Sequence, residues 1–162
     1  MRLTQFSDYA LRTLLFLGVH DDRLVPVSEI ARSYRISHHH LVKVAATLTQ
    51  LEVVEAVRGR GGGLRLAVDP ADVNVGWLLR RTEPDFHLVE CFDTANDTCP
   101  ITPACMLKTV LHEAQQNFLH TLDQYTLSDF LASPRRRQAF MKFWSAAAAA
   151  SEPVETDTTV DG

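Results

Sequence analysis

Two short amphipathic segments, followed by a basic glycine-rich turn, constrain the fold of this chain most strongly. Ser28 offers an N-cap for a helix over 28–34, and Ser37 offers one for a second helix over 37–51. Apolar residues in the second segment recur at the helical period, at Leu41, Val44, Ala45, Leu48 and Leu51. Two helices joined by the turn around Arg35 indicate a helix-turn-helix, whose second helix can enter the DNA major groove. Helical hairpins of this spacing also occur in proteins that never bind DNA.

A β-hairpin is predicted directly after these two helices. Residues 53–57 and 64–68 read as strands, and the second alternates apolar and polar side chains. The turn between them has the sequence Arg58-Gly59-Arg60-Gly61-Gly62-Gly63. Glycines let backbone amides approach phosphate closely, and arginines supply charge for phosphates or for the minor groove. We interpret the hairpin as a wing. A nucleotide-binding loop is disfavoured, because the Walker spacing and a following helix are both missing.

The remaining periodic segments predict a mainly α-helical protein with a small β-hairpin, a winged helix-turn-helix with a long dimerisation helix. Helices are expected over 8–20, 73–81 and 103–122. The longest carries an apolar stripe made of Met106, Leu107, Val110, Leu111, Ala114, Phe118 and Leu122. We expect it to pack against its counterpart in a homodimer, whose two-fold symmetry would match a palindromic operator. Packing within one subunit is the alternative.

One domain is expected over 1–132, with a peripheral helix and an acidic, disordered tail over 133–162. The final helix, over 135–150, ends in a run of alanines and has little to bury. Residues 151–162 lack large apolar side chains. No apolar run reaches the roughly 18 residues of a membrane span, and the amino terminus lacks a secretion signal, so we expect a cytoplasmic protein.

Charge is divided unevenly along the chain. Residues 1–81 carry 11 Lys and Arg against 8 Asp and Glu, a balance of +3, whereas residues 82–162 carry 5 against 12, a balance of −7. A basic amino-terminal half in an acidic protein suggests a polyanion partner for that half, although uneven surface chemistry gives the same pattern.

Three cysteines, Cys91, Cys99 and Cys105, lie within 15 residues, and the chain has no others. Such clustering is typical of a metal or iron–sulfur site, because thiolates must converge on one soft centre. The spacing of seven and five residues differs from the C-x2-C pairs of zinc fingers, and a fourth ligand is missing. A zinc-stabilised protein and a thiol-redox protein remain as alternatives, but no C-x-x-C or Cys-His motif supports a redox enzyme.

The predicted DNA contacts lie at the helix-turn-helix, over about 28–51, and on the wing. They are Ser28, Arg35, Ser37, His38, His39, His40 and Lys43, together with Arg58, Gly59, Arg60 and Gly61. The three consecutive histidines also suggest a metal site. Neighbouring residues on a helix point about 100° apart and do not converge easily on one ion, so groove contact is the better interpretation.

Five segments together resemble the NsrR family of nitric-oxide-sensing, iron–sulfur winged-helix repressors. They are MRLTQFSDYALR over 1–12, VRGRGGGLRL over 57–66, TEPDF over 82–86, VECF over 89–92 and CPITPAC over 99–105. The resemblance runs from Met1 to about Ala132, and the cysteine segment is its most specific part. It implies a regulator that binds an operator in double-stranded DNA, responds to nitric oxide and controls nitrosative-stress genes. It also implies that the protein is not an enzyme.

The resemblance further implies that Cys91, Cys99 and Cys105 ligate an iron–sulfur cluster from a loop over about 88–106, with 4Fe-4S favoured over 2Fe-2S. Asp8 of the partner subunit matches a carboxylate that supplies an oxygen ligand in some members. A capping role for Asp8 in the first helix, after Ser7, is the alternative reading of the same residue. Related regulators that sense cluster supply or iron use a tighter cysteine spacing together with a histidine. This chain lacks that tighter pattern.

Overall fold

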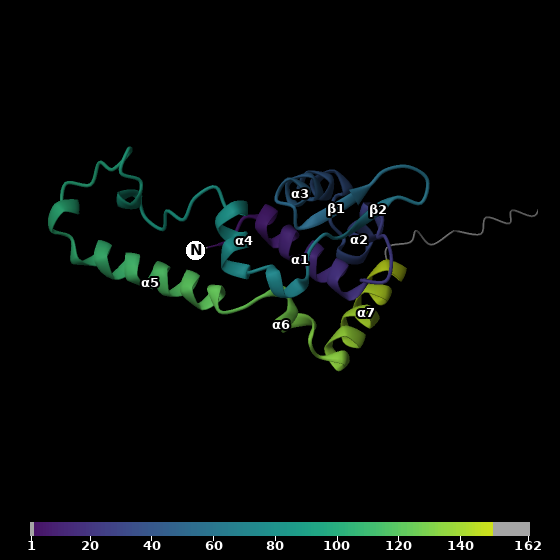
Figure 1. Ribbon diagram of the computed structural model, residues 1–162. Helices are drawn as coiled ribbons and strands as arrows, with labels where there is room; N and C mark the ends of the chain where they lie inside the picture. Colours follow the sequence, from purple (N-terminus) through teal and green to yellow (C-terminus); the bar gives the residue numbers. More distant parts are fainter. Residues whose placement is uncertain (1, 151–162) are drawn as a thin grey trace, which may run out of the picture.

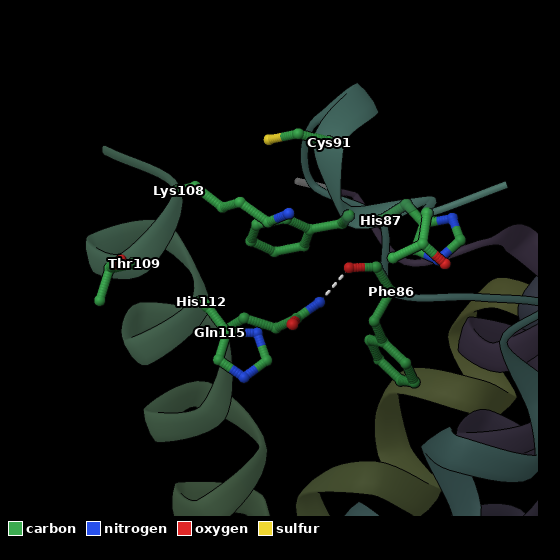
Figure 2. Close-up of a pocket in the computed structure, with 9 residues that line it drawn as sticks. Phe86, His87, Cys91, Lys108, Thr109, His112 and Gln115 are labelled. Atoms are coloured by element: carbon green, nitrogen blue, oxygen red, sulfur yellow. Dashed lines mark hydrogen bonds between the residues drawn. The ribbon is translucent and has the colours of Figure 1, made fainter. Parts of the chain in front are cut away.

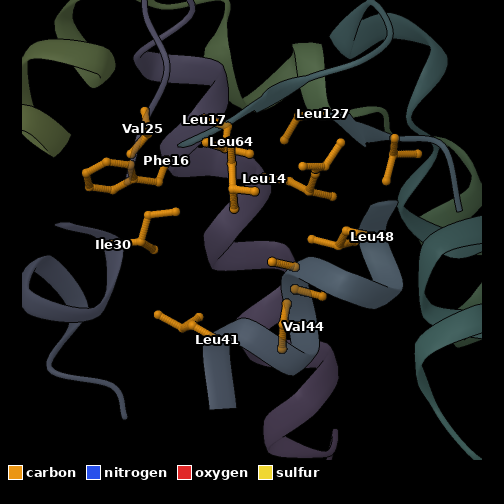
Figure 3. Close-up of a cluster of buried hydrophobic side chains, with 14 of the residues drawn as sticks. Leu14, Phe16, Leu17, Val25, Ile30, Leu41, Val44, Leu48, Leu64 and Leu127 are labelled. Carbon is orange, nitrogen blue, oxygen red and sulfur yellow. The ribbon is translucent and has the colours of Figure 1, made fainter. Parts of the chain in front are cut away.

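A computed structural model describes residues 2–150 of the chain and places helix α1 (Gln5–Val19) at its centre. Leu14, Phe16 and Leu17 on α1 are each 1% exposed. Figure 3 shows side chains from the neighbouring elements surrounding them, including Val25, Ile30, Leu41, Val44, Leu48, Leu64 and Leu127. One hydrophobic core therefore joins α1 to the helix-turn-helix, the hairpin and the later helices.

The helix-turn-helix consists of α2 (Val27–Tyr34) and α3 (His38–Gln50), as predicted. Arg35 ends α2 in the left-handed conformation, with φ 55°, and the amide of buried Ile36 donates to the Ala31 carbonyl at 2.9 Å. This tight turn fixes the direction in which α3 leaves α2.

The wing is the predicted antiparallel hairpin of β1 (Val54–Val57) and β2 (Gly63–Leu66). Val25 exchanges two backbone hydrogen bonds with Leu64, at 2.9 and 2.8 Å, so β2 is tied to the segment before α2. Because Leu64 is also buried in the core, the wing has a fixed position relative to the helix-turn-helix.

Beyond the wing, a short 3-10 turn, η1 (Pro70–Asp72), leads into α4 (Val75–Thr82). The chain then leaves the core, as Figure 1 shows: a loop containing the 3-10 turns η2 (Glu90–Phe92) and η3 (Thr102–Ala104) precedes the long helix α5 (Met106–Asp123). We call residues 84–123 the cysteine arm, and the other described residues the winged body. Arg80 donates to both carboxylate oxygens of Asp123, at 2.5 and 2.9 Å, where the arm rejoins α4.

Two further helices close the winged body. Helix α6 (Leu127–Leu131) begins with a capping box formed by Thr126 and Asp129. Its Leu131 lies so close to α1 that a Cβ at Gly18 would meet the leucine Cδ1 at 2.4 Å, which explains the glycine there. Helix α7 (Pro134–Ala149) is capped by Ser133, whose side chain accepts the amide of Arg136. The predicted disordered tail over 151–162 lies outside the described residues.

The predicted starts of α1 and α2 are wrong. Helix α1 begins at Gln5, where the hydroxyl of Thr4 accepts the amide of Ser7, so Asp8 lies inside the first turn and is not the cap. Helix α2 begins one residue before Ser28, after Pro26, and has no side-chain cap hydrogen bond. Thr4 is held by a tertiary contact, because its backbone amide donates to Glu83 at 2.9 Å.

The long helix also differs from its prediction. It begins at Met106, because Thr102–Ala104 forms a 3-10 turn. Within the described chain its buried residues are Gln115 and Leu119, whereas Met106, Leu107 and Val110 of the predicted stripe are exposed. The first half of the stripe therefore has no cover within one subunit.

Candidate functional site

The predicted DNA-reading residues of α3 lie on its exposed side. Leu41, Val44 and Leu48 are buried against the core, and this leaves His38, His39, His40 and Lys43 exposed at the start of the helix. The ring of His40 stacks with Tyr9 of α1, with centroids 6.4 Å apart. Tyr9 therefore contacts the recognition helix directly, a contact that the sequence alone did not indicate.

A shallow basic groove lies beside the turn between α2 and α3. It has a volume of about 410 Å³ and is lined by Ser28, Ala31, Arg32, Arg35, Ile36 and His38. Three of these residues were predicted from the sequence; Arg32 was missed, although it follows Ser28 by one helical turn. Ser37 precedes α3 as expected, but its side chain makes no capping hydrogen bond and is exposed beside the groove.

The tip of the wing projects the remaining predicted DNA contacts. Gly59 and Gly61 adopt φ values of 101° and 79°, which favour glycine, and a Cβ at Gly62 would meet the Val57 carbonyl oxygen at 2.2 Å. Arg58 and Arg60 are exposed in this turn. The glycines thus allow a tight turn that presents two free arginines and its backbone to a polyanion.

The three cysteines are spread over the cysteine arm. Cys91 lies in η2, Cys99 in the loop, and Cys105 directly before α5; all three are free and half-buried. Across residues 2–150, no three His, Cys, Asp or Glu side chains lie close enough together to hold one metal ion, which applies to these thiols and to the three histidines. The set of donors suits a soft metal centre, but the single chain does not gather it into a cage.

Carboxylates organise the loop that carries the cysteines. Glu90 accepts hydrogen bonds from the backbone and hydroxyl of Thr98, at 2.8 and 2.6 Å, so the residues directly before Cys91 and Cys99 are linked. Asp97 accepts from the Cys99 amide at 3.1 Å. The hydrogen bonds from Thr98 lower the pKa of Glu90, and a hydrogen bond from Asn96 lowers the pKa of Asp93. The loop is thus shaped by polar contacts rather than by an apolar core.

A hollow of about 570 Å³ lies beside Cys91, between the loop and α5. Figure 2 shows Cys91, Lys108 and His112 around it, and Gln115, which donates a hydrogen bond to the Phe86 carbonyl. Phe92 packs edge-on against His112, with centroids 5.8 Å apart. The hollow places one thiol next to a mainly apolar space with a single cationic side chain.

Asp8 has a defined partner within its own chain. Its carboxylate pairs with Arg12, one helical turn away, at 2.7 and 2.9 Å, and the Asp8 side chain is 41% exposed. The Arg12 guanidinium lies over the rings of Tyr9 and Tyr34, 6.0 and 5.7 Å from their centroids. Asp8 is therefore linked through Arg12 to Tyr9, which contacts the recognition helix.

Comparison with known proteins places this arrangement among transcription regulators. The family model Rrf2, described as an iron-dependent transcriptional regulator, matches residues 3–133. The HTH-type transcriptional regulator NsrR of Bacillus subtilis strain 168 is 49% identical over 132 residues, covering 81% of this chain and 90% of that protein. The NsrR of Halalkalibacterium halodurans is 44% identical over 143 residues, covering 88% and 98%.

The fold has a counterpart among solved structures. T. potens IscR superimposes with a TM-score of 0.65 at 24% identity, covering 82% of this chain and 87% of that chain. At this identity the likeness concerns the fold alone. It confirms the mainly helical architecture with a β-hairpin that the sequence predicts.

Proposed function

The chain belongs to the Rrf2 family of transcriptional regulators, and on that premise we propose that it is a homodimeric repressor that senses nitric oxide through an iron–sulfur cluster. The relatives make it a DNA-binding transcription regulator of the helix-turn-helix type rather than an enzyme. Among the described residues, no helix is long and apolar enough to cross a membrane. We place the protein in the cytoplasm, where it would control nitrosative-stress genes.

One observation carries the proposal: all three cysteines of the chain are free and half-buried in a single polar loop, in a protein nearly half identical to an NsrR. Cys91, Cys99 and Cys105 would hold the cluster, with Asp8 of the partner subunit as fourth ligand. Bound there, a 4Fe-4S cluster supplies iron that reacts with nitric oxide. The loop has to tighten around its ligand, since the single chain does not gather the thiols.

The winged body supplies the reading surface in this proposal. The exposed start of α3 would enter the major groove, while Arg35 and the arginines of the wing would contact phosphates. All of these groups lie on the half of the sequence with the positive balance. Salt should therefore weaken binding to any duplex, because phosphate contacts release condensed cations.

The exposed half of α5 supports the homodimer. Met106, Leu107 and Val110 are 76%, 63% and 54% exposed on successive turns of one helix. An apolar stripe of this kind is costly in water, and the same stripe on a second copy can cover it. Two reading surfaces related by a two-fold axis would then fit a palindromic operator.

A coupling from Asp8 to DNA follows from its contacts. If Asp8 ligated a metal ion, the ion would compete with Arg12 for the carboxylate oxygens and would weaken their present ion pair. Arg12 lies over Tyr9, and Tyr9 stacks with His40 at the start of α3. A change in the Asp8–Arg12 ion pair would therefore alter the contacts at the start of the recognition helix.

The test is anaerobic absorption spectroscopy of the purified protein, with and without nitric oxide. We expect a brown protein whose visible absorption changes with nitric oxide. Cys99→Ala should be colourless and still dimeric, whereas Thr94→Ala, an exposed change in the same loop, should keep its colour. A colourless wild-type protein with bound zinc would overturn the proposal. A coloured protein indifferent to nitric oxide would favour a regulator of cluster supply.

A further inference from the structure

Helix α7 lies beyond residue 133, where the family match ends, and it packs against the first helix of the helix-turn-helix. Its contact is made by Trp144, which is 8% exposed. The indole ring lies 4.5 Å from the ring centroid of Phe16 and 5.6 Å from that of Tyr34. The neighbouring Phe143 is 67% exposed. One face of α7 is therefore packed against α1 and α2, although its alanine run suggests a helix with little to bury.

A polar contact near its start and a ring contact near its end fix the helix on this site. Near its start, Arg137 donates to the Val19 carbonyl and to the Asp21 carboxylate, both at 3.1 Å, and so ties α7 to the end of α1. Near its end, the Trp144 ring packs edge-on against the ring of Tyr34, with an angle of 73° between the two planes. Helix α7 thus bridges α1 and α2.

Tyr34 is the last residue of α2, and Arg35 directly follows it in the left-handed conformation. The orientation of Arg35 and the start of α3 depends on how this end of α2 is held. Helix α2 has only eight residues, of which Ile30, Ala31 and Ser33 are buried. A large ring packed edge-on against Tyr34 therefore contributes a substantial part of the packing at the point where the turn begins.

We propose that Trp144 is a positioning residue for DNA recognition: by packing on Tyr34 it holds the turn that carries Arg35 and the start of α3. Trp144 itself need not touch DNA. The role requires only that the chain binds DNA, and it is independent of the cluster and of nitric oxide. Affinity for a specific DNA sequence should depend on Trp144 more than affinity for any duplex does. Base contacts require the correct orientation of α3, whereas contacts to phosphates are the same for every sequence.

The test compares Trp144→Ala with Trp144→Phe, and with Phe143→Ala as an exposed control one residue away. The probes are a duplex that the wild-type protein selects from a random-sequence library and a scrambled duplex of the same length. Trp144→Ala should lose about tenfold in affinity for the selected duplex, the size of one mismatched base pair, with little change for the scrambled one. Trp144→Phe should recover most of the loss, because it keeps an aromatic ring.

Thermal unfolding and cluster absorbance are measured on the same samples. Equal losses on both duplexes, in step with the unfolded fraction, would overturn the proposal, as would wild-type binding by Trp144→Ala. If Trp144→Ala does not fold, Trp144→Leu decides, because it fills much of the same space but removes the aromatic ring that packs against Tyr34. A loss of about threefold on the selected duplex is then expected, as for one aromatic pair. An unchanged affinity would overturn the proposal.

Discussion

The winged body and the cysteine arm are built by different forces. In the body, apolar residues at helical spacing point inward, and Leu14, Leu41 and Leu48 are at most 2% exposed. In the arm, Leu107 and Ile101 are each 63% exposed, and the loop is held by hydrogen bonds to its own carboxylates. The body can therefore reach its fold from its own sequence, whereas the arm leaves apolar surface and thiols for other partners to cover.

This difference also separates the residues that would bind DNA from the cysteines that would sense nitric oxide. The basic residues that would meet DNA lie on the body, where packing fixes the helices and the wing that carry them. The thiols lie on the arm, which joins the body through Arg80 and Asp123 at one end and through the loop after α4 at the other. A ligand that rearranges the arm can therefore act on DNA binding without unfolding the reading surface.

The largest effect should come from breaking the core of the body. Leu48 is fully buried, so Leu48→Ala should lower the free energy of unfolding by about 2–5 kcal/mol. Ile101→Ala in the arm should cost less than about 0.5 kcal/mol, because its side chain is exposed. Urea unfolding followed by circular dichroism gives both values. Similar losses for the two variants would contradict the division between body and arm.

The next effect tests what covers the arm. Leu107→Asp places a charge in the exposed apolar stripe of α5, and it should weaken the dimer at least about thirtyfold, as loss of an interface hot spot does. Met141→Asp, at an exposed apolar position of α7, should leave the dimer intact. Sedimentation velocity distinguishes monomer from dimer. If only the Met141 variant dissociated, the dimer interface would lie on the winged body and not on the cysteine arm.

A smaller effect is expected at the wing. Arg60→Ala should weaken the selected and scrambled duplexes alike, and it should reduce the salt dependence of log K by about 0.9, the contribution of one phosphate contact. Lys142→Ala, an exposed change on α7, should do neither. Fluorescence anisotropy at several salt concentrations measures both slopes. A loss confined to the selected duplex would instead make Arg60 a reader of bases.

The smallest effect concerns the joint between the two regions. The hydrogen bonds from Arg80 lower the pKa of Asp123 below its ordinary value of 3.8. The stabilisation is therefore complete above that value and is lost as the pH falls through the lower pKa of the folded state. Urea midpoints between about pH 5 and pH 2 should fall less steeply for Asp123→Asn than for the wild type. Parallel profiles would show that this pair does not stabilise the joint.

The body could be predicted closely from the sequence, because its helices and wing each have one apolar side. The short helix α6 was missed, although Thr126 and Asp129 have the spacing of a capping box. A cap at Asp8, after Ser7, is one of the two readings that the sequence allows for this residue, whereas a tertiary contact between Thr4 and Glu83 moves the start of the helix to Gln5.

The arm and α7 could be predicted less well. The loop between α4 and α5 has no periodicity, and its shape depends on pairs such as Glu90 and Thr98, eight residues apart. Phe140, Phe143 and Trp144 share a helix, but only the position of α7 in the fold decides that Trp144 is buried. That the three cysteines lie in one loop could be predicted, because they cluster in the sequence. That the single chain does not bring their thiols together could not be predicted.

In the proposed switch, chemistry at the cysteine arm changes DNA binding by the winged body. This switch is tested most directly by measuring affinity for the selected duplex on one anaerobic sample before and after nitric oxide, with the scrambled duplex as control. We expect a loss of at least about a hundredfold on the selected duplex, toward the affinity for the scrambled one, while the protein stays folded. Unchanged affinity after the absorption of the cluster has altered would contradict the claim.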